Sequence, residues 1–195
     1  MRVNLRLIQL LGDALIPILG FFWWNWNLYF IVLFYLLDLI ANEFIVHLKA
    51  NKIQKHHEQR DNKKWLVNAM IGVCLLIFGL VLTHLALQQI QPDIDFKKEL
   101  IAFWTYEDLG MEQGYFLLPL IIFASYQRYK MEFLLSKKYI TQTTIELFRG
   151  HIQSLLMIIG FVGIAYGVSF LVVFPEIVYV LGIILLTSIY QLLGK

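Results

Sequence analysis

The sequence has few charged residues, few prolines and a single cysteine. Only 15% of its 195 residues are charged and 59% are hydrophobic, whereas about 25% of residues are charged in ordinary soluble domains. The two longest connections between apolar runs, about 49–64 and 89–113, are too short to bury a core of their own. This excludes a separate soluble domain and predicts that lipid is the main solvent of the chain.

Several chemical signatures are also missing. Cys74 falls in the middle of an apolar run, which excludes an intramolecular disulfide and predicts a small packed hydrophobic residue. The sequence has no Gly-rich phosphate loop, no GxSxG nucleophile motif and no HExxH zinc motif. No basic patch is interleaved with exposed aromatic residues, so nucleic acid is not an expected partner. No cofactor is expected.

Six apolar runs reach or approach the about 17 to 25 residues that a spanning helix needs. They cover about 5–24, 28–48, 65–88, 114–135, 145–173 and 177–193. The sequence therefore predicts one all-α domain over 1–195, a polytopic transmembrane helical bundle of about six spans. Arg2 and Arg6 precede the first run as in a signal peptide, but no small-x-small cleavage site follows before Phe21, so we expect this helix to be retained.

The distribution of Lys and Arg predicts the orientation, because cytoplasmic loops carry an excess of these residues. With both termini inside, 14 of the 16 fall on the cytoplasmic side, and only Lys97 and Lys98 fall outside. N-in, C-in is therefore the expected topology. Apolar residues at roughly helical spacing between 95 and 112 predict an amphipathic outer segment, lying on the surface or over the mouth of the bundle. Thr143 and Glu146 have the form of a capping box at the start of the fifth span.

The second span carries polar residues that need explaining, in the stretch YLLDLIANEFIVH from Tyr35. Its 14 Leu, Ile, Phe and Val residues each contribute about −0.5 kcal/mol to insertion, and each central carboxylate costs about 3 kcal/mol. Gain and cost nearly cancel for this helix. Asp38 and Glu43 must therefore face other helices or water, as intramembrane carboxylates almost always do.

The depth of each carboxylate in the membrane suggests which of them lie close together. Asp38 lies near the midpoint of the second span and Asp13 near the midpoint of the first, so their carboxylates could approach each other across the short turn. Two such groups in a low dielectric would share a proton or bind a cation, and we expect no basic residue at matching depth. The alternative is that each carboxyl is protonated, or hydrogen-bonded to Asn42 or to the backbone, and fixes helix packing.

A second polar group is expected toward the cytoplasm. Glu43 and His47 are four residues apart and share one helix face, and His151 lies at a similar depth at the start of the fifth span. These residues could form a proton relay or, with His56 or His57, a metal site. The alternative is that both histidines are interfacial polar residues. His84 lies toward the other end of the third span, too far away to join them.

Two stretches resemble a known family. The sequence from Ala14, ALIPILGFFWWNWNLYFIVLFYLLDLIANEFIVHLKANKI, resembles the opening of a group of uncharacterised bacterial integral membrane proteins, a domain of unknown function. Their pattern is a short apolar helix, a Trp-bearing turn and a Tyr-Trp-x-Glu helix; here Tyr35 and Asp38 lie where the Tyr and the acid would be, but Leu36 replaces the Trp and Asp38 replaces the Glu. RGHIQSLLMIIG, from Arg149, is similar to their Arg-x-x-x-x-His helix with shorter spacing. The resemblance implies a bacterial inner-membrane location and a recurring acid at Asp38.

Three functional hypotheses follow. The first is an oligomeric bundle that moves or senses a proton or small cation through Asp13, Asp38 and Glu43. The second is a non-transporting accessory or effector subunit, of a defence or envelope system for example, that docks a membrane partner protein. Its expected partner loop contains five basic residues, Lys52, Lys55, Arg60, Lys63 and Lys64. The third is a membrane-embedded enzyme that uses Glu43, His47, Arg149 and His151.

Overall fold

The computed structural model of the chain is almost entirely helical. It describes residues 5–57, 62–105, 107–108 and 111–193, although side chains near some of these ends are not described. The helices are α1 (Leu5–Trp23), α2 (Leu28–His57), α3 (Asn62–Ile90), α4 (Phe96–Thr105), α5 (Gln113–Tyr129), the π-helix η1 (Lys130–Leu134), α6 (Lys138–Thr141), α7 (Thr144–Ser169) and α8 (Glu176–Leu193). This confirms the all-α prediction.

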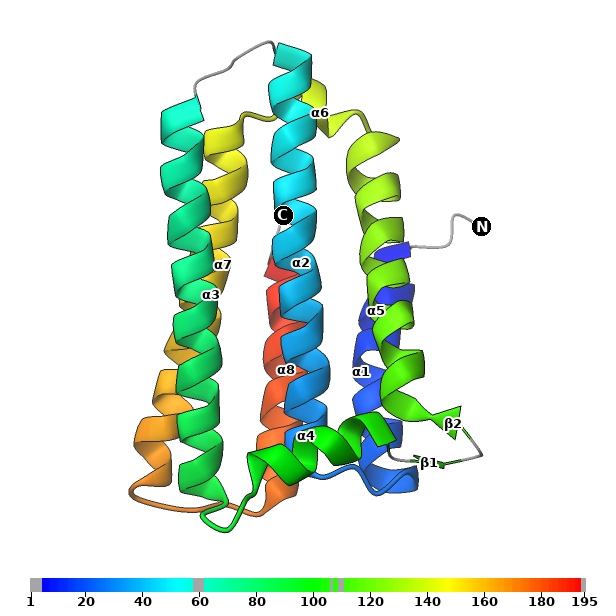
Figure 1. Ribbon diagram of the computed structural model, residues 1–195, viewed down its shortest axis with the longest axis vertical. Coiled ribbons are helices and arrows are strands. Elements are labelled where there is room, and N and C mark those ends of the chain that lie inside the picture. Colours follow the sequence, from blue (N-terminus) through cyan, green and yellow to red (C-terminus); the bar gives the residue numbers. More distant parts are fainter. Residues whose placement is uncertain (1–4, 58–61, 106, 109–110, 194–195) are drawn as a thin grey trace.

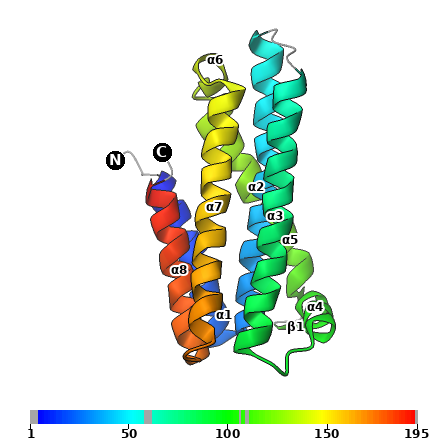
Figure 2. The ribbon, with the colours of Figure 1, turned by 90° about the vertical axis from the view of Figure 1, so that its left-hand side faces the viewer.

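The long helices stand in two layers of three. Figure 1 shows α3, α2 and α5 side by side in front of α7, α8 and α1, and Figure 2 shows the same two layers from the side. The most extensive contact joins α3 to α7, and α2 contacts α3, α5, α7 and α8. The second apolar run therefore forms the central helix of the bundle, which is where its polar residues can find partners.

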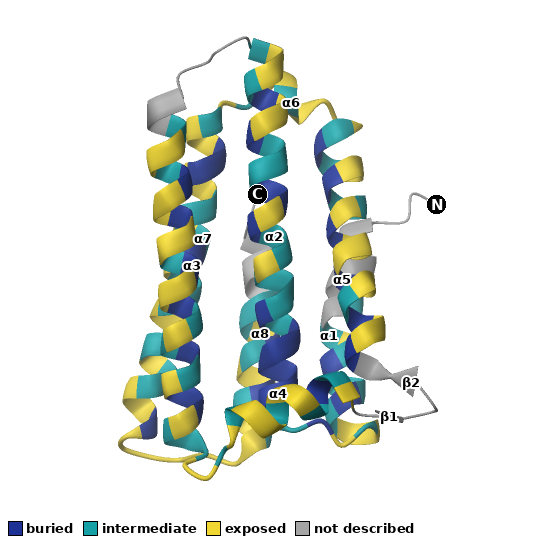
Figure 3. Ribbon diagram, in the orientation of Figure 1, coloured by how far each residue is buried: buried dark blue, intermediate teal, exposed yellow. Residues whose placement is uncertain are grey.

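Among the residues that the structure describes, three helices have the length and apolar composition of membrane spans: 28–57 in α2, 65–90 in α3 and 144–169 in α7. Each of these helices contains an apolar stretch of 18 residues, and the share of that stretch that is buried within the protein is 56% in α2, 22% in α3 and 11% in α7. Figure 3 shows exposed residues along the outer side of α3, and many residues of α7 are exposed as well. Many of them are large and apolar, including Phe78, Phe161 and Ile164. Such an exposed apolar face is what a bilayer would cover.

The other apolar runs are also helical but shorter. Within the described residues, Ala14–Trp23 and Glu176–Ser188 are apolar helical segments of less than spanning length. The run at 114–135 is divided between α5 and η1, where the N–H of Leu135 reaches back five residues to the carbonyl of Lys130 at 2.9 Å. This widened turn buries Phe133, which stacks on Tyr129.

Two expected connections differ from the structure. Most of the segment 49–64 is helical, because α2 continues to His57 and α3 begins at Asn62; residues 58–61 lie outside the described residues. The outer segment 95–112 is only partly helical: α4 ends at Thr105, and β1 (Glu107–Asp108) pairs antiparallel with β2 (Met111–Glu112). Figure 1 shows α4 lying across the end of the bundle, and Phe103 is its buried anchor. The side chain of Asn27 also donates to Glu99 at 2.6 Å and ties α4 to the start of α2.

The start of α7 has the predicted cap. The N–H of Glu146 donates to the side chain of Thr143 at 3.2 Å, and the N–H of Thr143 donates to the carboxylate of Glu146 at 3.0 Å. This reciprocal pair satisfies two backbone donors that the first turn of a helix leaves without partners. The cap fixes where α7 begins, and with it the height at which His151 faces α2.

Candidate functional site

The polar residues of α2 face two different neighbours. Asp38 and Glu43 are five residues apart, which places them about 140° apart around a helix of 3.6 residues per turn. Asp38 points toward α5, and Glu43 points toward α7 and α3. The two carboxylates therefore belong to separate groups instead of one common site.

Glu43 lies between two imidazoles. One carboxylate oxygen, Oε1, is 3.1 Å from Nε2 of His47, and the other, Oε2, is 2.5 Å from Nε2 of His151. The side chains of Glu43 and His151 are each 8% exposed, and that of His47 is 31% exposed. The predicted proximity of these three residues is confirmed, and the group joins α2 to α7.

The third helix of this junction approaches through a glycine. A Cβ added to Gly72 of α3 would lie 3.3 Å from Oε1 of Glu43 and 3.6 Å from the His151 ring. A larger residue would displace the carboxylate. His47 also has aromatic neighbours, Trp65 at 6.3 Å and Phe148 at 6.1 Å between ring centroids. Glu43 is therefore held between three helices and screened by apolar rings.

Chemically, this arrangement suits proton exchange better than metal binding. A carboxylate can only accept hydrogen bonds, so each Nε2 that bonds to Glu43 carries a hydrogen while the carboxylate is ionised. Histidine is the side chain whose ordinary titration lies closest to neutral pH. No group of three or more His, Cys, Asp or Glu residues in the described part of the chain could hold a metal ion. His57 does not complete a metal site either, since its Nε2 bonds to the carbonyl of Tyr139 at 3.2 Å.

Asp38 has a different set of partners, of which the sequence predicted only Asn42. Asn42 donates to its Oδ2 at 3.0 Å, as one alternative predicted, and Ser125 donates to its Oδ1 at 3.5 Å. Arg128 of α5 approaches the same Oδ1 at 3.6 Å. The expectation that no basic residue lies at the depth of the carboxylates is therefore wrong, because the long side chain of Arg128 brings its guanidinium close to Asp38.

The remaining candidate residues are placed as follows. Asp13 lies in α1, but its side chain is outside the described residues, so its predicted approach to Asp38 stays a prediction. Lys52 and Lys55 are exposed on α2, and the Lys52 amine lies 5.1 Å from the centroid of the Tyr139 ring. Arg60 is outside the described residues, as are the side chains of Lys63 and Lys64 in α3. Arg149, expected near the histidines in an enzyme, is exposed at the start of α7.

Three residues of these groups were missed from sequence: Gly72, Ser125 and Arg128. Gly72 sits in an apolar run with other glycines, and nothing local separates it from them. Ser125 and Arg128 are three residues apart on α5, so they share a face. A polar pair on one face at the end of an apolar run was the one signal that could have identified them.

Comparison of the chain with known proteins found no relative. No protein-family model, no curated protein and no solved structure matches the chain.

Proposed function

We propose that this protein is a bacterial inner-membrane bundle of about six spans, with both termini in the cytoplasm, that moves protons through Glu43 and its two histidines. The three long apolar helices and the exposed apolar faces of α3 and α7 support a membrane location. The excess of Lys and Arg in the segments assigned to the cytoplasm supports the orientation. The extent of the apolar α3 and α7 surface also fits a homo-oligomer, in which copies would cover part of it.

One observation carries the proposal: the buried carboxylate of Glu43 bridges His47 on its own helix and His151 on α7. In a membrane, an ionisable group that faces the interior of a bundle is a functional candidate by default. A carboxylate between two imidazoles can accept the Nε2 proton of one ring when that ring is doubly protonated. It can then pass a proton to the other ring once Nε2 of that ring has lost its own hydrogen, with little movement of heavy atoms. His47 is the more exposed of the two rings and is the natural entry point.

Asp38 has a secondary role in this proposal. Its approach to Arg128 partly neutralises the carboxylate, so it is a poorer site for a free cation than the sequence suggested. Asn42 and Ser125 supply further hydrogen bonds. We infer that this group holds α5 against α2 and maintains the geometry around the helix that carries Glu43.

The test is proton flux into liposomes that contain the purified protein and a pH-sensitive dye, under a potassium diffusion potential. Glu43→Gln keeps the shape of the side chain and removes its proton-accepting charge. We expect the flux of wild type to fall about tenfold or more in Glu43→Gln and in His151→Phe, as when a positioned proton-transfer group is lost. Lys55→Gln, an exposed change on the same helix, is the matched control and should conduct like wild type.

Two results would contradict the proposal. Wild type without flux above that of protein-free liposomes would exclude proton movement, and equal flux in wild type and Glu43→Gln would exclude this site. An infrared difference spectrum between pH 5 and 8 separates the two cases. A carboxyl band that titrates in wild type and is absent in Glu43→Gln would show that Glu43 exchanges protons without moving them across the membrane.

A docking role remains the second candidate, and one observation favours it. Lys52 and Lys55 are exposed near the end of α2, where Figure 1 shows α2 extending beyond α8. A membrane partner protein with an acidic surface could bind there. Affinity purification should then recover a stoichiometric partner that is lost in the double variant Lys52→Gln, Lys55→Gln, while proton flux stays unchanged.

A further inference from the structure

A group of basic residues lies where the apolar part of α2 ends. Lys49 and Lys52 follow the apolar run that ends at about residue 48, and Arg128 lies in the last turn of α5. Lys138 is the first residue of α6, which contacts both α2 and η1, and Figure 1 shows α6 beside the end of α2. We refer to Lys49, Lys52, Arg128 and Lys138 as the basic cluster. Its position corresponds to the boundary between hydrocarbon and lipid headgroups.

Aromatic rings lie against two of the amines in the basic cluster. The Lys49 amine is 5.8 Å from the centroid of the Phe133 ring, and the Lys52 amine is 5.1 Å from that of the Tyr139 ring. The two rings are 6.2 Å apart, and Phe133 is buried. A ring contacts one side of an ammonium group, so the other N–H donors of that group can still bind an anion. The two amines therefore lie along one aromatic surface with donors left for a ligand.

Arg128 has hydrogen-bond donors that the described residues leave unused. Its Nη2 is 3.6 Å from Oδ1 of Asp38, which exceeds the limit of about 3.2 Å for an N–H···O hydrogen bond. Within the described part of the chain the guanidinium makes no hydrogen bond, and its Nε is buried. A guanidinium is a planar group whose paired donors match two oxygens of a phosphate. With Nε covered, the terminal nitrogens of Arg128 are the ones that an anion would reach.

The charges around Lys49 also favour an anion. Lys49 interacts with the positive charges of Arg128 and Lys138, and the acidic residue that interacts with it is Glu132. Like charges this close repel one another, and a bound anion would replace that repulsion with attraction. At the edge of a bilayer, the anionic groups at the same depth are the phosphates of lipids. A lipid phosphate is therefore the partner that fits both the charge and the position of the cluster.

From this arrangement we propose that the basic cluster binds the headgroup of an anionic phospholipid. The terminal nitrogens of Arg128 donate to the two non-bridging oxygens of the phosphate, and the Lys49 amine donates to one of them. Lys52 and Lys138, which are both exposed, add positive charge at the rim of the site. The proposal rests on the membrane location of the bundle and does not depend on the proton pathway.

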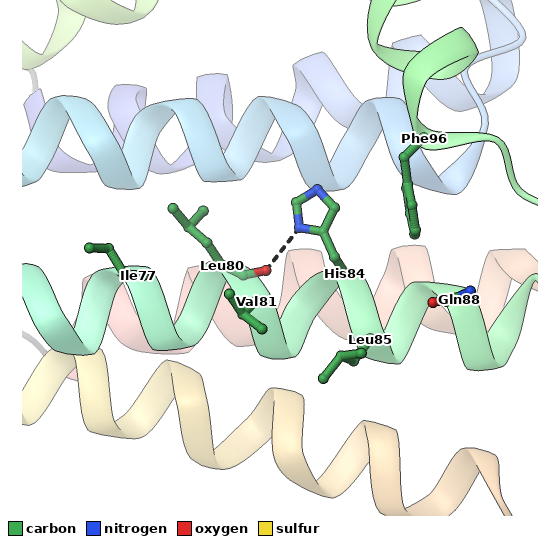
Figure 4. Close-up of a pocket in the computed structure, with 7 residues that line it drawn as sticks. All are labelled: Ile77, Leu80, Val81, His84, Leu85, Gln88 and Phe96. Carbon is green, nitrogen blue, oxygen red and sulfur yellow. Dashed lines mark hydrogen bonds between the residues drawn. The ribbon is translucent and has the colours of Figure 1, made fainter.

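The charge of the headgroup determines which lipids bind. Phosphatidylcholine carries the same phosphate, but its trimethylammonium group would be repelled by the lysines. The apolar surface of α3 gives the contrast: in Figure 4 its polar residue His84 is bonded to the carbonyl of Leu80 at 2.8 Å. The residues that line this surface include no lysine or arginine. Acyl chains would cover that surface whatever their headgroup, whereas the basic cluster should select anionic lipids.

The experiment is native mass spectrometry of the purified full chain in detergent that contains equal amounts of phosphatidylglycerol and phosphatidylcholine with the same acyl chains. We expect phosphatidylglycerol to be bound about tenfold or more in excess over phosphatidylcholine, because several cations act on one phosphate. Inorganic phosphate at millimolar concentration is the second probe and should not displace the lipid. Displacement would mean that the site takes a free anion, and the lipid proposal would fail.

Three variants and a matched control localise the site. Lys49→Gln and Lys138→Gln each remove one charge, and we expect each to bind phosphatidylglycerol about fivefold less, the effect of one lysine near the headgroups. Arg128→Lys keeps the charge and loses the planar pair of donors, so it should also bind more weakly. Lys55→Gln removes one charge from an exposed residue of α2 outside the cluster and should bind like wild type.

Two results overturn the proposal. Equal losses in Lys55→Gln and Lys49→Gln would mean that the whole basic surface attracts lipid without a defined site. Equal binding of the two lipids by wild type would mean that the cluster does not select an anionic headgroup, and would favour an acidic protein as the partner of Lys52 and Lys55. Unfolding midpoints in phosphatidylcholine that match wild type, required of each variant, ensure that weaker binding does not report misfolding.

Discussion

The carboxylate of Glu43 on α2 lies 2.5 Å from Nε2 of His151 on α7, although 108 residues separate them in the chain. The contact joins the central helix of the bundle to α7, in which few residues of the apolar stretch are fully buried. Gly72 of α3 lies against the same pair. This junction of three helices is both the candidate site and a point where the helices pack closely together. Substitutions of its residues should therefore change function, and substitutions elsewhere in the bundle should change mainly stability.

The close approach at Gly72 predicts a functional effect. In Gly72→Val the added side chain would push Glu43 away from His47, because even a Cβ would lie 3.3 Å from Oε1. We expect proton flux to fall about as far as in Glu43→Gln, about tenfold. Gly160→Val in α7, where an added Cβ meets no atom within 4 Å, is the control. Equal flux in both variants would show that the position of Glu43 does not matter.

The turn between α1 and α2 predicts a stability effect. A Cβ at Gly20 would overlap the indole ring of Trp26, which is 3% exposed. Overpacking of this kind costs about 1–3 kcal/mol, and Gly20→Ala should lower the thermal unfolding midpoint in detergent. Gly160→Ala should raise it slightly, since Ala favours helix over Gly by about 1 kcal/mol. A midpoint unchanged by Gly20→Ala would mean that Trp26 moves aside at no cost.

The Asp38 and Arg128 pair predicts energetic coupling. The two side chains are 26% and 24% exposed, so removal of one partner should cost about 1–3 kcal/mol, less than for a fully buried pair. Unfolding in detergent should show that Asp38→Asn and Arg128→Gln are each destabilised. The double variant should lose less than the sum of both, because neither charge is left alone. Strict additivity would mean that the pair does not interact in solution.

The cap of α7 predicts a smaller, local loss. Thr143→Ala removes the acceptor for the N–H of Glu146 and should reduce the free energy of unfolding by about 1 kcal/mol. Thr144→Ala changes the neighbouring residue, whose side chain is not part of the capping box, and serves as the comparison. Faster amide hydrogen exchange in the first turn of α7 should accompany the loss in Thr143→Ala alone.

The proposed topology predicts from which side of the membrane a maleimide reagent can label each introduced cysteine. Cys74 lies in a candidate span and should not react with a membrane-impermeant maleimide in intact vesicles, although it is exposed on α3. In a Cys74→Ser background, Lys52→Cys and Lys97→Cys place single thiols at opposite ends of the bundle. They should react from opposite sides of the membrane, with Lys52→Cys on the cytoplasmic side. Reaction of both from one side would exclude the proposed topology.

The sequence by itself determined the properties that depend on local composition and spacing. Apolar runs of spanning length predicted helices, and the spacing of Thr143 and Glu146 predicted a cap that the structure confirms. The cost of placing a carboxylate in hydrocarbon predicted that Asp38 and Glu43 face protein or water, and both do contact other helices. Glu43 and His47 could be paired because a helix brings residues four apart onto one face.

Only the tertiary structure decided which distant residues complete each group. Helices α2 and α3 are apolar on nearly every side, so hydrophobic periodicity does not indicate how each is rotated or which neighbour each face meets. Arg128 reaches Asp38 on α2 through its long, flexible side chain. Gly72 matters because its lack of a side chain lets the backbone of α3 approach Glu43. Such contacts follow from the packing of whole helices, so no local sequence signal specifies them.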